Sequence, residues 1–452
     1  MRIELSIPQD FLDLLSATGG IFYGDIRNRF IEAITTDSRE CSDGDIFFAL
    51  DGKCKSGNDY IADAIERGAI PIGRGVKRYG IRVDSANEAL LSFASFYKRH
   101  LPNILHTVAI TGSVGKTTTK EFLKILSSTR YKTHATWENF NNDIGVPLTV
   151  LSADKDTEVL ILEFGMNHEG EIKRLSSAFT PNSAVITKIG TAHIGMLGSR
   201  ENIARAKLEI ISGLSGTLML PKGENLLSTD YPRVRFFSAA DSTADVSIEK
   251  NQFDRLEFYS GGNLYSIFDF PLKADHILEC LAASSIAAAE LGLSPDEITE
   301  GIRLISDDSF RHKIIESKNG YTIIDDSYNA SYESVKASLS ILNEIKDSKK
   351  KCVLIGDIFE LGRFDHEIHH SIGEIIKDFD IDYLFLIGNS ASAVYEGAIS
   401  KGFSKEHIFI LNDISFPIEV ADFIKCMLSP KDAILIKASH GMNLTKITEL
   451  IR

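Results

Sequence analysis

The stretch that decides the fold is Thr107-Val-Ala-Ile-Thr-Gly-Ser-Val-Gly-Lys-Thr-Thr-Thr-Lys120. Its apolar first half has the pattern of a buried strand, which runs into a turn containing Gly112 and Gly115, and Lys116 and Thr117 then open a helix. Glycines at these places let backbone N–H groups turn inward around phosphate oxygens without a Cβ in the way. Lys116 would bring a positive charge to the β- and γ-phosphates, and Thr117 a hydroxyl to a magnesium ion. The stretch therefore predicts a phosphate-binding loop.

The spacing of this loop differs from the standard G-x-x-x-x-G-K-[ST] pattern. The first glycine of that pattern would fall at position 110, which is Ile110 here. The plainer alternative is a glycine-containing turn before a helix that binds nothing. The order of strand, turn, Lys-Thr-Thr and helix favours the phosphate loop.

Similar apolar runs recur along the chain, each followed by a polar loop and a helical pattern, as in parallel sheets built from βα units. Those in the middle and last parts of the chain are 107–110, 159–162, 184–189, 321–324, 351–355, 383–387 and 433–437. We predict an α/β protein of three domains. These are a small α/β domain at 1–84, a central phosphate-loop ATPase with a mostly parallel sheet at 85–311, and a Rossmann-like C-terminal domain at 312–452.

Composition limits the possible partners and compartment. The 452 residues are 43% hydrophobic and 25% charged, an ordinary mix for globular domains. The net charge of -14 argues against nucleic acid or an anionic membrane as the main partner. Five scattered cysteines without a Cys-x-x-Cys argue against a disulfide framework or a structural zinc site. With no signal-peptide pattern and no apolar run of roughly 20 residues, we expect a soluble, cytoplasmic protein, and a monomer.

Two further strands end in groups suited to a metal–phosphate site. The run 159–162 leads into Glu163, and the run 184–189 leads to His193. Ligands gather at the carboxyl ends of the strands in such sheets, where a carboxylate and a neutral imidazole can hold divalent cations. Taken alone, a glutamate at a strand end is usually solvated and a single histidine is more often structural. Their shared placement with the phosphate loop favours the metal site.

Lys207 lies on the apolar face of a predicted helix at 199–214. One interpretation is a lysine whose stem is buried and whose ammonium reaches water. The other is a buried lysine with a lowered pKa, available as a neutral amine for chemistry or modification. The spacing of the residues fits both interpretations equally.

The segment Asn139-Phe-Asn-Asn-Asp-Ile-Gly-Val-Pro147 places three amides and an acid before a helix. Asn139 and Asn142 could orient a polar substrate. Such residues are equally good turn formers, so both interpretations stay open.

The phosphate loop, the asparagine-containing segment and the segment after Glu163 together resemble those of the Mur ligase family. The matching segments follow one another in the family's order over nearly the whole chain, and they are 36–39, 44–52, 109–118, 139–148, 162–172, 190–193, 204–207, 324–330 and 356–362. The last two, together with His369, resemble the branch that adds D-alanyl-D-alanine to a UDP-N-acetylmuramoyl tripeptide.

The resemblance implies roles for individual residues. The ATP phosphates would be held by Gly112, Ser113, Val114, Gly115, Lys116, Thr117 and Thr118. Magnesium would be held by Thr117, Glu163, His193 and a carbamylated Lys207. Arg311 would reach the γ-phosphate, Asp325 and Asn329 would face the nucleotide, and Ser38 and Arg39 would contact the uridine diphosphate.

The resemblance also implies a reaction. The expected enzyme is an ATP-dependent ligase of peptidoglycan precursor synthesis that activates a carboxylate as an acyl phosphate and joins it to an amine, with ATP and Mg²⁺ as cofactors. Its partners would be small molecules: a UDP-muramoyl peptide and a dipeptide or amino acid.

Some positions depart from the family's pattern. Ile277 and Cys280 stand where the family usually has asparagines, and His440 stands where it usually has arginine. Alternatives are therefore a paralogue that ligates a different carboxylate or amine, a phosphate-loop ATPase switch, and a binding protein with a vestigial site. The set Lys116, Glu163, His193 and Lys207 favours a working ligase.

Overall fold

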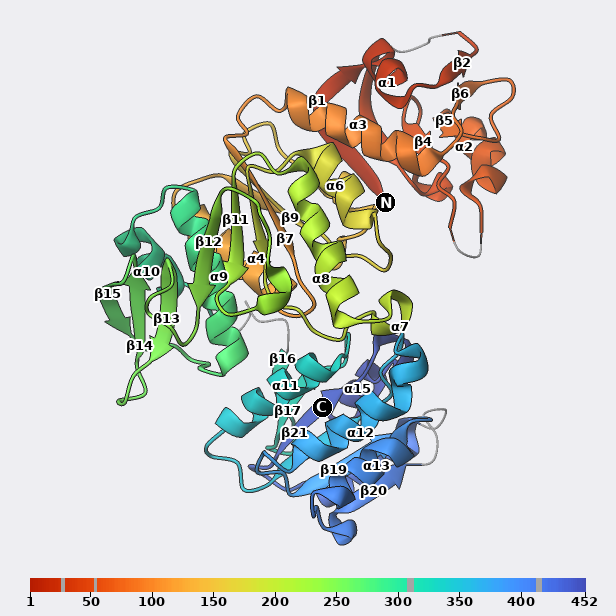
Figure 1. Ribbon diagram of the computed structural model, residues 1–452. Coiled ribbons are helices and arrows are strands. Elements are labelled where there is room, and N and C mark those ends of the chain that lie inside the picture. Colours follow the sequence, from red (N-terminus) through yellow and green to blue (C-terminus); the bar gives the residue numbers. More distant parts are fainter. Residues whose placement is uncertain (26–28, 53–54, 307–312, 412–416) are drawn as a thin grey trace.

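The computed structural model describes residues 1–25, 29–52, 55–306, 313–411 and 417–452. Its described residues form three sheets, each from a separate part of the chain, and the three-domain α/β architecture expected from the sequence is confirmed. Figure 1 shows the three parts in series, with the N-terminal part in red and orange, the central part mainly in green and the C-terminal part in blue. No helix among the described residues combines the length and apolar character needed to cross a bilayer.

The N-terminal sheet is mixed. Its strands, in spatial order, are β1 (Arg2–Asp10), β3 (Phe30–Thr35), β4 (Ile46–Phe48), β5 (Ile70–Gly73), β6 (Gly80–Arg82) and β2 (Ile21–Tyr23). The helices of this part are α1 (Phe11–Thr18), α2 (Ile61–Glu66) and α3 (Ala86–His100). Helix α3 packs on α1, β4 and β5 and also on α5 (Gly145–Leu151) and α6 (Glu171–Phe179) of the central part (Figure 1). It therefore joins the two parts, and the boundary at 84/85, which lies just before it, stays a prediction.

The central sheet carries the quoted stretch on an inner strand. Its order is β15 (Asn263–Phe268), β14 (Leu256–Ser260), β13 (Val246–Lys250), β12 (Val234–Ser238), β11 (Thr217–Pro221), β10 (Ser183–Ile186), β7 (His106–Thr111), β9 (Val159–Glu163) and β8 (Thr133–Ala135). In this spatial order, neighbouring strands from β13 through β7 to β8 pair in parallel. The pairs β13–β14 and β14–β15 are antiparallel. Because β7 lies between β9 and β10, the chain segments that follow these three strands meet at one edge of the sheet.

Helices cover this sheet and carry the remaining site residues. They are α4 (Lys116–Ser128), α7 (Ile194–Leu197), α8 (Arg200–Leu208), α9 (Asp275–Glu290) and α10 (Pro295–Arg303). The helix predicted at 199–214 is shorter than expected: α8 ends at Leu208, and a 3₁₀ helix, η3 (Glu209–Gly213), follows.

The C-terminal sheet has helices on both faces. Its order is β16 (Lys313–Glu316), β17 (Thr322–Asp326), β21 (Ala433–Lys437), β18 (Lys351–Ile355), β19 (Tyr383–Ile387) and β20 (Ile408–Leu411), with only β16 antiparallel. The helices are α11 (Tyr332–Glu344), α12 (Asp365–Ile376), α13 (Ala391–Ser400), α14 (Pro417–Met427) and α15 (Thr445–Ile451). Along β18, Val353 and Ile355 belong to one buried cluster and Cys352 and Leu354 to another, as alternation along a strand requires when both faces are covered.

Candidate active site

The loop between β7 and α4 has the backbone that the sequence predicts. Gly112 has a φ of 154° and Gly115 a φ of 86°, both in the region that favours glycine. A Cβ on Gly112 would lie 1.9 Å from Thr187 Oγ1, and one on Gly115 would lie 2.8 Å from Cys280 Sγ. Gly115 is also the N-cap of α4 and no side chain caps the helix, so its first N–H groups are available to an anion.

The loop is held in place from the neighbouring strand. Ser113 N donates to Lys188 O at 2.7 Å, and Thr187 Oγ1 donates to Val114 O at 2.5 Å, both bonds reaching the residues that follow β10. Lys116 Nζ donates to Gly112 O at 2.8 Å and so lies across the loop. The amine is thus placed at the mouth of the loop, where phosphate oxygens would accept from it.

Glu163 lies directly beside the first turn of α4. It is buried, and its Oε1 accepts from Thr117 Oγ1 at 3.2 Å and from Asn141 Nδ2 at 2.9 Å. Its Oε2 is buried with no hydrogen-bond partner among the described residues. A buried carboxylate oxygen without a partner is costly, so its presence here points to a ligand that is bound in the working protein.

Lys207 is buried on α8, and the interpretation that its ammonium reaches water does not fit, because the residue is only 2% exposed. Burial lowers its pKa well below the usual value of 10.5, and the charge of Lys116 lowers that pKa further. No carboxylate among the described residues offsets this effect. The side chain is therefore biased toward a neutral amine near the phosphate loop.

The chemistry of these groups fits a divalent cation of the magnesium type. Thr117 and the unpartnered oxygen of Glu163 are the hard oxygen ligands that such a cation prefers. Within the described ranges, no three His, Cys, Asp or Glu side chains gather closely enough to hold a metal by themselves. A complete site therefore requires a further ligand, such as the nucleotide or a carboxylate added to Lys207.

His193 lies at the start of α7. Its Nδ1 bonds with Oε2 of Glu360, from the C-terminal part of the chain, at 2.6 Å. A second contact of the same kind lies close by, where Thr191 donates from both N and Oγ1 to Glu333 Oε2 at 2.9 Å. The structure thus joins Thr117 to Glu163 next to Lys116 and places Lys207 within electrostatic reach of Lys116. It places His193 where the central and C-terminal parts meet.

A cleft opens in front of the phosphate loop and is closed on its far side by the C-terminal part. Its lining residues are 113–118, Ala192, His276, Ile277, Asp326, 329–331, Ser334, Ala337, Ser338, Ile341 and Lys437. The predicted residue Asn329 is among them, whereas the predicted Asp325 is not; its Oδ1 instead accepts from Ser327 N and Oγ. The prediction for Arg311 lies outside the described residues.

The sequence did not indicate Asp326 and Lys437, which line this cleft, or Asn141, which bonds to Glu163. Lys437 is buried, and its Nζ donates to Asp326 Oδ2 and to Asn329 O, both at 2.6 Å. Asn141 is the amide that reaches Glu163, not Asn139 or Asn142. For Asp326 and Lys437, the available signal was their position at the ends of neighbouring strands β17 and β21, which pair in register.

The asparagines of the segment 139–147 act locally. Asn142 is exposed, and its Oδ1 accepts from Ile144 N and Gly145 N at the start of α5, which supports its interpretation as a turn former. Asn139 is exposed, and its carbonyl accepts from Asn141 N. This backbone bond shapes the turn from which Asn141 reaches into the site.

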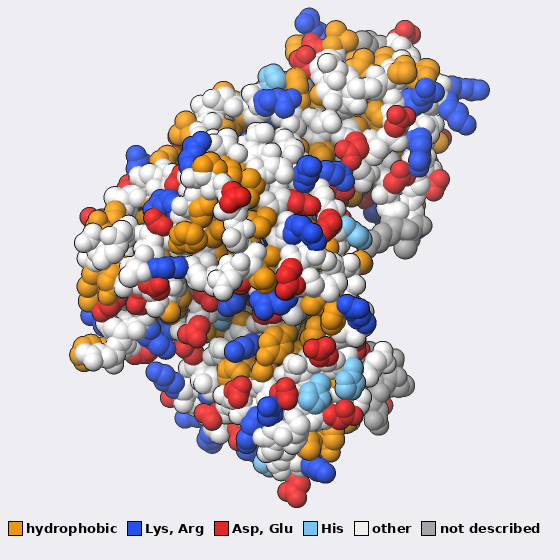
Figure 2. All heavy atoms as spheres, in the orientation of Figure 1, with side chains coloured by type: hydrophobic (Ala, Val, Ile, Leu, Met, Phe, Trp, Pro, Cys, Tyr) orange, Lys and Arg blue, Asp and Glu red, His pale blue; other side chains and the backbone are white. Residues whose placement is uncertain are grey.

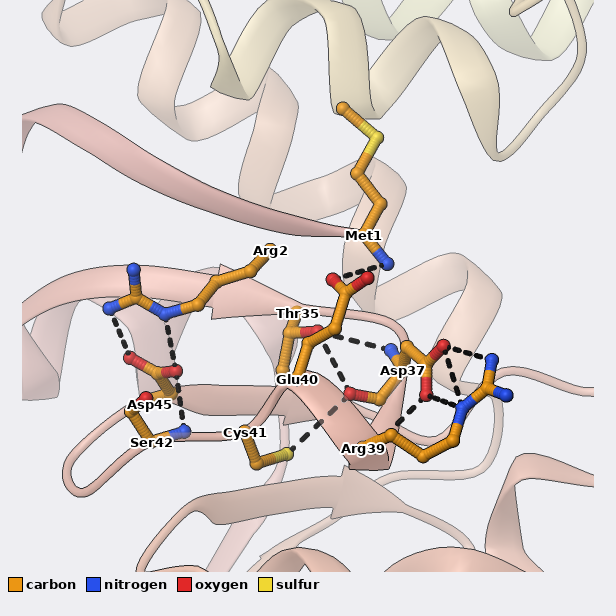
Figure 3. Close-up of polar contacts among 9 residues, drawn as sticks. All are labelled: Met1, Arg2, Thr35, Asp37, Arg39, Glu40, Cys41, Ser42 and Asp45. Atoms are coloured by element: carbon orange, nitrogen blue, oxygen red, sulfur yellow. Dashed lines mark hydrogen bonds and ion pairs between the residues drawn. The ribbon is translucent and has the colours of Figure 1, made fainter.

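Ser38 and Arg39 lie in the N-terminal part, on the 3₁₀ helix η1 (Ser38–Glu40). Figure 3 shows the Arg39 guanidinium turned toward Asp37, with which it makes an ion pair at 2.6 Å. Hydrogen bonds from Arg39 hold the pKa of Asp37 down at about 2. Arg39 remains largely exposed, and Ser38 is buried. Neither residue contacts the phosphate loop, so any role for them belongs to a second, separate binding surface.

Acidic and basic side chains alternate over the face shown in Figure 2, without a broad basic area. This distribution agrees with the net charge of -14 and offers no continuous positive surface for a nucleic acid on that face.

Three models of Mur ligase domains match successive parts of the chain. The Mur ligase family catalytic domain matches residues 30–98, the Mur ligase middle domain residues 110–288, and the glutamate ligase domain of Mur ligases residues 310–440. A relative from Bacillus subtilis (strain 168), UDP-N-acetylmuramoyl-tripeptide–D-alanyl-D-alanine ligase, is 33% identical over 93% of each chain.

Solved structures agree over the same length. A crystal structure of MurF from Acinetobacter baumannii superimposes with a TM-score of 0.87 at 26% identity, covering 99% of both chains. MurF ligase from Thermotoga maritima, in complex with ADP, superimposes with a TM-score of 0.79 at 26% identity, covering 92% of this chain and 96% of that one.

Proposed function

The chain belongs to the Mur ligase family, and on this premise we propose that it is an ATP-dependent ligase that joins D-alanyl-D-alanine to a UDP-N-acetylmuramoyl tripeptide. The observation that carries the proposal is a phosphate loop whose Lys116 and Thr117 line a cleft, with Glu163 bonded to Thr117. Buried Lys207, whose pKa is lowered by burial and by the charge of Lys116, supports it. ATP is the proposed nucleotide, and the ADP complex of the Thermotoga maritima neighbour supports that choice.

The first chemical step is activation of the peptide carboxylate. A carboxylate is a poor electrophile, so one of its oxygens attacks the γ-phosphorus of ATP and ADP leaves, which yields an acyl phosphate. The backbone N–H groups at the start of α4 orient the phosphates, and Lys116 moves from the loop carbonyls to neutralise their growing charge.

Thr117, Glu163, His193 and a carbamylated Lys207 are the residues that would hold magnesium. When bound, magnesium supplies positive charge that offsets the charge of the phosphate oxygens. Lys207 suits carbamylation because a neutral amine, and not an ammonium, reacts with carbon dioxide, and burial favours the neutral form.

The second step forms the amide. The amine of D-alanyl-D-alanine attacks the acyl carbon, a tetrahedral intermediate forms, and inorganic phosphate leaves. The cleft between the phosphate loop and β17, α11 and β21 keeps water from the acyl phosphate, which would otherwise hydrolyse.

We assign the UDP end of the substrate to residues 1–84, ATP chemistry to 85–311, and completion of the nucleotide site to 312–452. Ser38, on η1, is the proposed uridine diphosphate contact, with Arg39 released from Asp37 to join it. Asp326 and Lys437 join Asn329 as proposed nucleotide-facing groups, because they line the cleft. We also propose a monomer in the cytoplasm, which size-exclusion chromatography with light scattering and cell fractionation would test.

Phosphate release by the purified protein tests the proposal. Incubation with ATP, Mg²⁺, UDP-N-acetylmuramoyl tripeptides and a panel of dipeptides and amino acids should release phosphate only when both a carboxylate and an amine substrate are present. Release with a different acceptor or donor would identify a paralogue of changed specificity. Full release without either substrate would instead indicate an ATPase switch.

A further inference from the structure

The contact between His193 and Glu360 joins a proposed metal-holding residue to the C-terminal part of the chain. A carboxylate only accepts, so Nδ1 of His193 carries a proton and, in the neutral ring, Nε2 keeps the free lone pair. Building on the proposed function, we propose that Glu360 is a positioning residue that sets the orientation and tautomer of His193 for magnesium. Metal-holding histidines commonly donate their second ring N–H to a carboxylate in this way.

The backbone on both sides of the contact is fixed. His193 has a φ of 64° and Glu360 a φ of 66°, conformations that residues with a Cβ rarely adopt. Gly195 N donates to Glu360 O at 3.0 Å, and a Cβ at position 195 would lie 2.4 Å from that oxygen. The segments around His193 and Glu360 therefore contact each other through a backbone hydrogen bond as well as through the His193–Glu360 side-chain pair.

The loop that carries Glu360 is braced from within the C-terminal part. Ile358 N donates to Nε2 of His369, a residue only 1% exposed, at 3.0 Å. Phe359 N donates to Ser439 Oγ at 2.8 Å. Because these two bonds immediately precede Glu360, its carboxylate is presented from a rigid loop and does not have to be ordered when His193 meets it.

This arrangement makes the metal site depend on the placement of the C-terminal part. Figure 1 shows α7, which His193 precedes, on the side of the central part that faces the C-terminal sheet and its helices. If the C-terminal part moves away, His193 loses the acceptor that fixes its tautomer, and its lone pair is no longer held at Nε2. Binding of the divalent cation and closure of the cleft are thereby coupled.

The test is the affinity for Mn²⁺, used in place of Mg²⁺, measured by electron paramagnetic resonance of free Mn²⁺ in the presence of saturating ADP. Glu360→Ala should weaken Mn²⁺ binding by about 10–100-fold, the range typical of such supporting groups. Glu360→Gln keeps an acceptor for Nδ1–H and should recover most of that loss. The double variant His193→Ala/Glu360→Ala should bind no more weakly than His193→Ala, because Glu360 acts through the histidine.

Glu333→Ala is the matched control for Glu360→Ala, since it removes the neighbouring contact to Thr191 without touching His193. It should leave Mn²⁺ affinity within about twofold of the unaltered protein. An equal loss in Glu333→Ala, or additive losses in the double variant, would overturn the proposal by showing a general effect of lost contact between the two parts. Normal Mn²⁺ affinity in His193→Ala would overturn it together with the proposed metal role of His193. A complete lack of ADP binding by the unaltered protein would instead remove the proposed function itself.

Discussion

Lys207→Met keeps most of the length of the side chain and removes its amine. The variant therefore separates the effect of the buried amine on the free energy of unfolding from its effect on ligation activity. The side chain is 2% exposed and no carboxylate compensates its charge among the described residues. Burying a polar group without a partner costs about 1–3 kcal/mol in mutational series. We therefore expect the free energy of unfolding to rise by about 1–3 kcal/mol at neutral pH, and Tm to rise by about 2–4 °C for each kcal/mol.

The sign of the pH dependence follows from the direction of the pKa shift. The folded-state pKa of Lys207 lies below its usual value of 10.5, so between those two values the unfolded chain binds more protons. The burial penalty is fully present below the folded-state pKa and fades as pH rises toward 10.5. The gain from Lys207→Met should therefore be largest at low pH within the stable range and should shrink at alkaline pH.

Calorimetry in carbon dioxide-free buffer measures the change in Tm, and phosphate release measures the change in ligation activity. Lys207→Met should melt higher and lose ligation by about 100-fold or more, as expected when a group that acts in the transition state is removed. Lys207→Ala leaves room for formate or acetate and should regain part of its activity when these are added, whereas Lys207→Met, which fills that space, should not. A lower Tm in Lys207→Met, or turnover within about twofold of the unaltered protein, would refute the reasoning.

Two substitutions and one labelling experiment test other parts of the site. Glu163→Gln should weaken Mg²⁺ binding by at least about 10-fold, which isothermal titration with ADP and Mg²⁺ measures. Its Tm should stay equal or rise in a thermal melt, because a buried charge with an unpartnered oxygen is removed. Gly112→Ala should destabilise the protein by about 1–3 kcal/mol and abolish ADP binding, because its Cβ would meet Thr187 Oγ1; normal binding would contradict the loop geometry. Burial raises the pKa of Cys280 to about 12, so at pH 8 iodoacetamide should label exposed Cys426 and leave Cys280 unmodified, as peptide mass spectrometry would show.

The sequence predicts the local elements of this protein well. Strands β18, β19 and β21 have the predicted bounds; β9 is one residue longer at one end, and β7 is one residue longer at each end. The reason is that a fully buried parallel strand must be apolar throughout, and a phosphate loop needs glycine at fixed places. The position of Lys207 shares a face of α8 with apolar residues, but this spacing left open whether its ammonium reaches water, and only the burial of the residue in the structure decides between the two interpretations.

Contacts between distant segments are harder to infer from the sequence. Asp325 and Asp326 are adjacent on β17 and point to opposite faces, so a shift of one residue decides which of them lines the cleft. Three asparagines lie close together at 139–142, and only the turn geometry selects Asn141 to reach Glu163. The partner of His193 comes from a residue 167 positions away, on another domain, and nothing in the local pattern specifies that pairing.

If the loop around Lys116 drives phosphoryl transfer to a carboxylate of the acceptor, an oxygen isotope in that carboxylate passes to the released phosphate. The acceptor peptide is labelled with ¹⁸O in the carboxylate that becomes the amide, and the released phosphate is examined by mass spectrometry. Because the attacking carboxylate oxygen stays on phosphorus when the acyl phosphate breaks down, we expect one ¹⁸O atom in each phosphate released. Phosphate without the label, formed at the same rate as the amide, would contradict it.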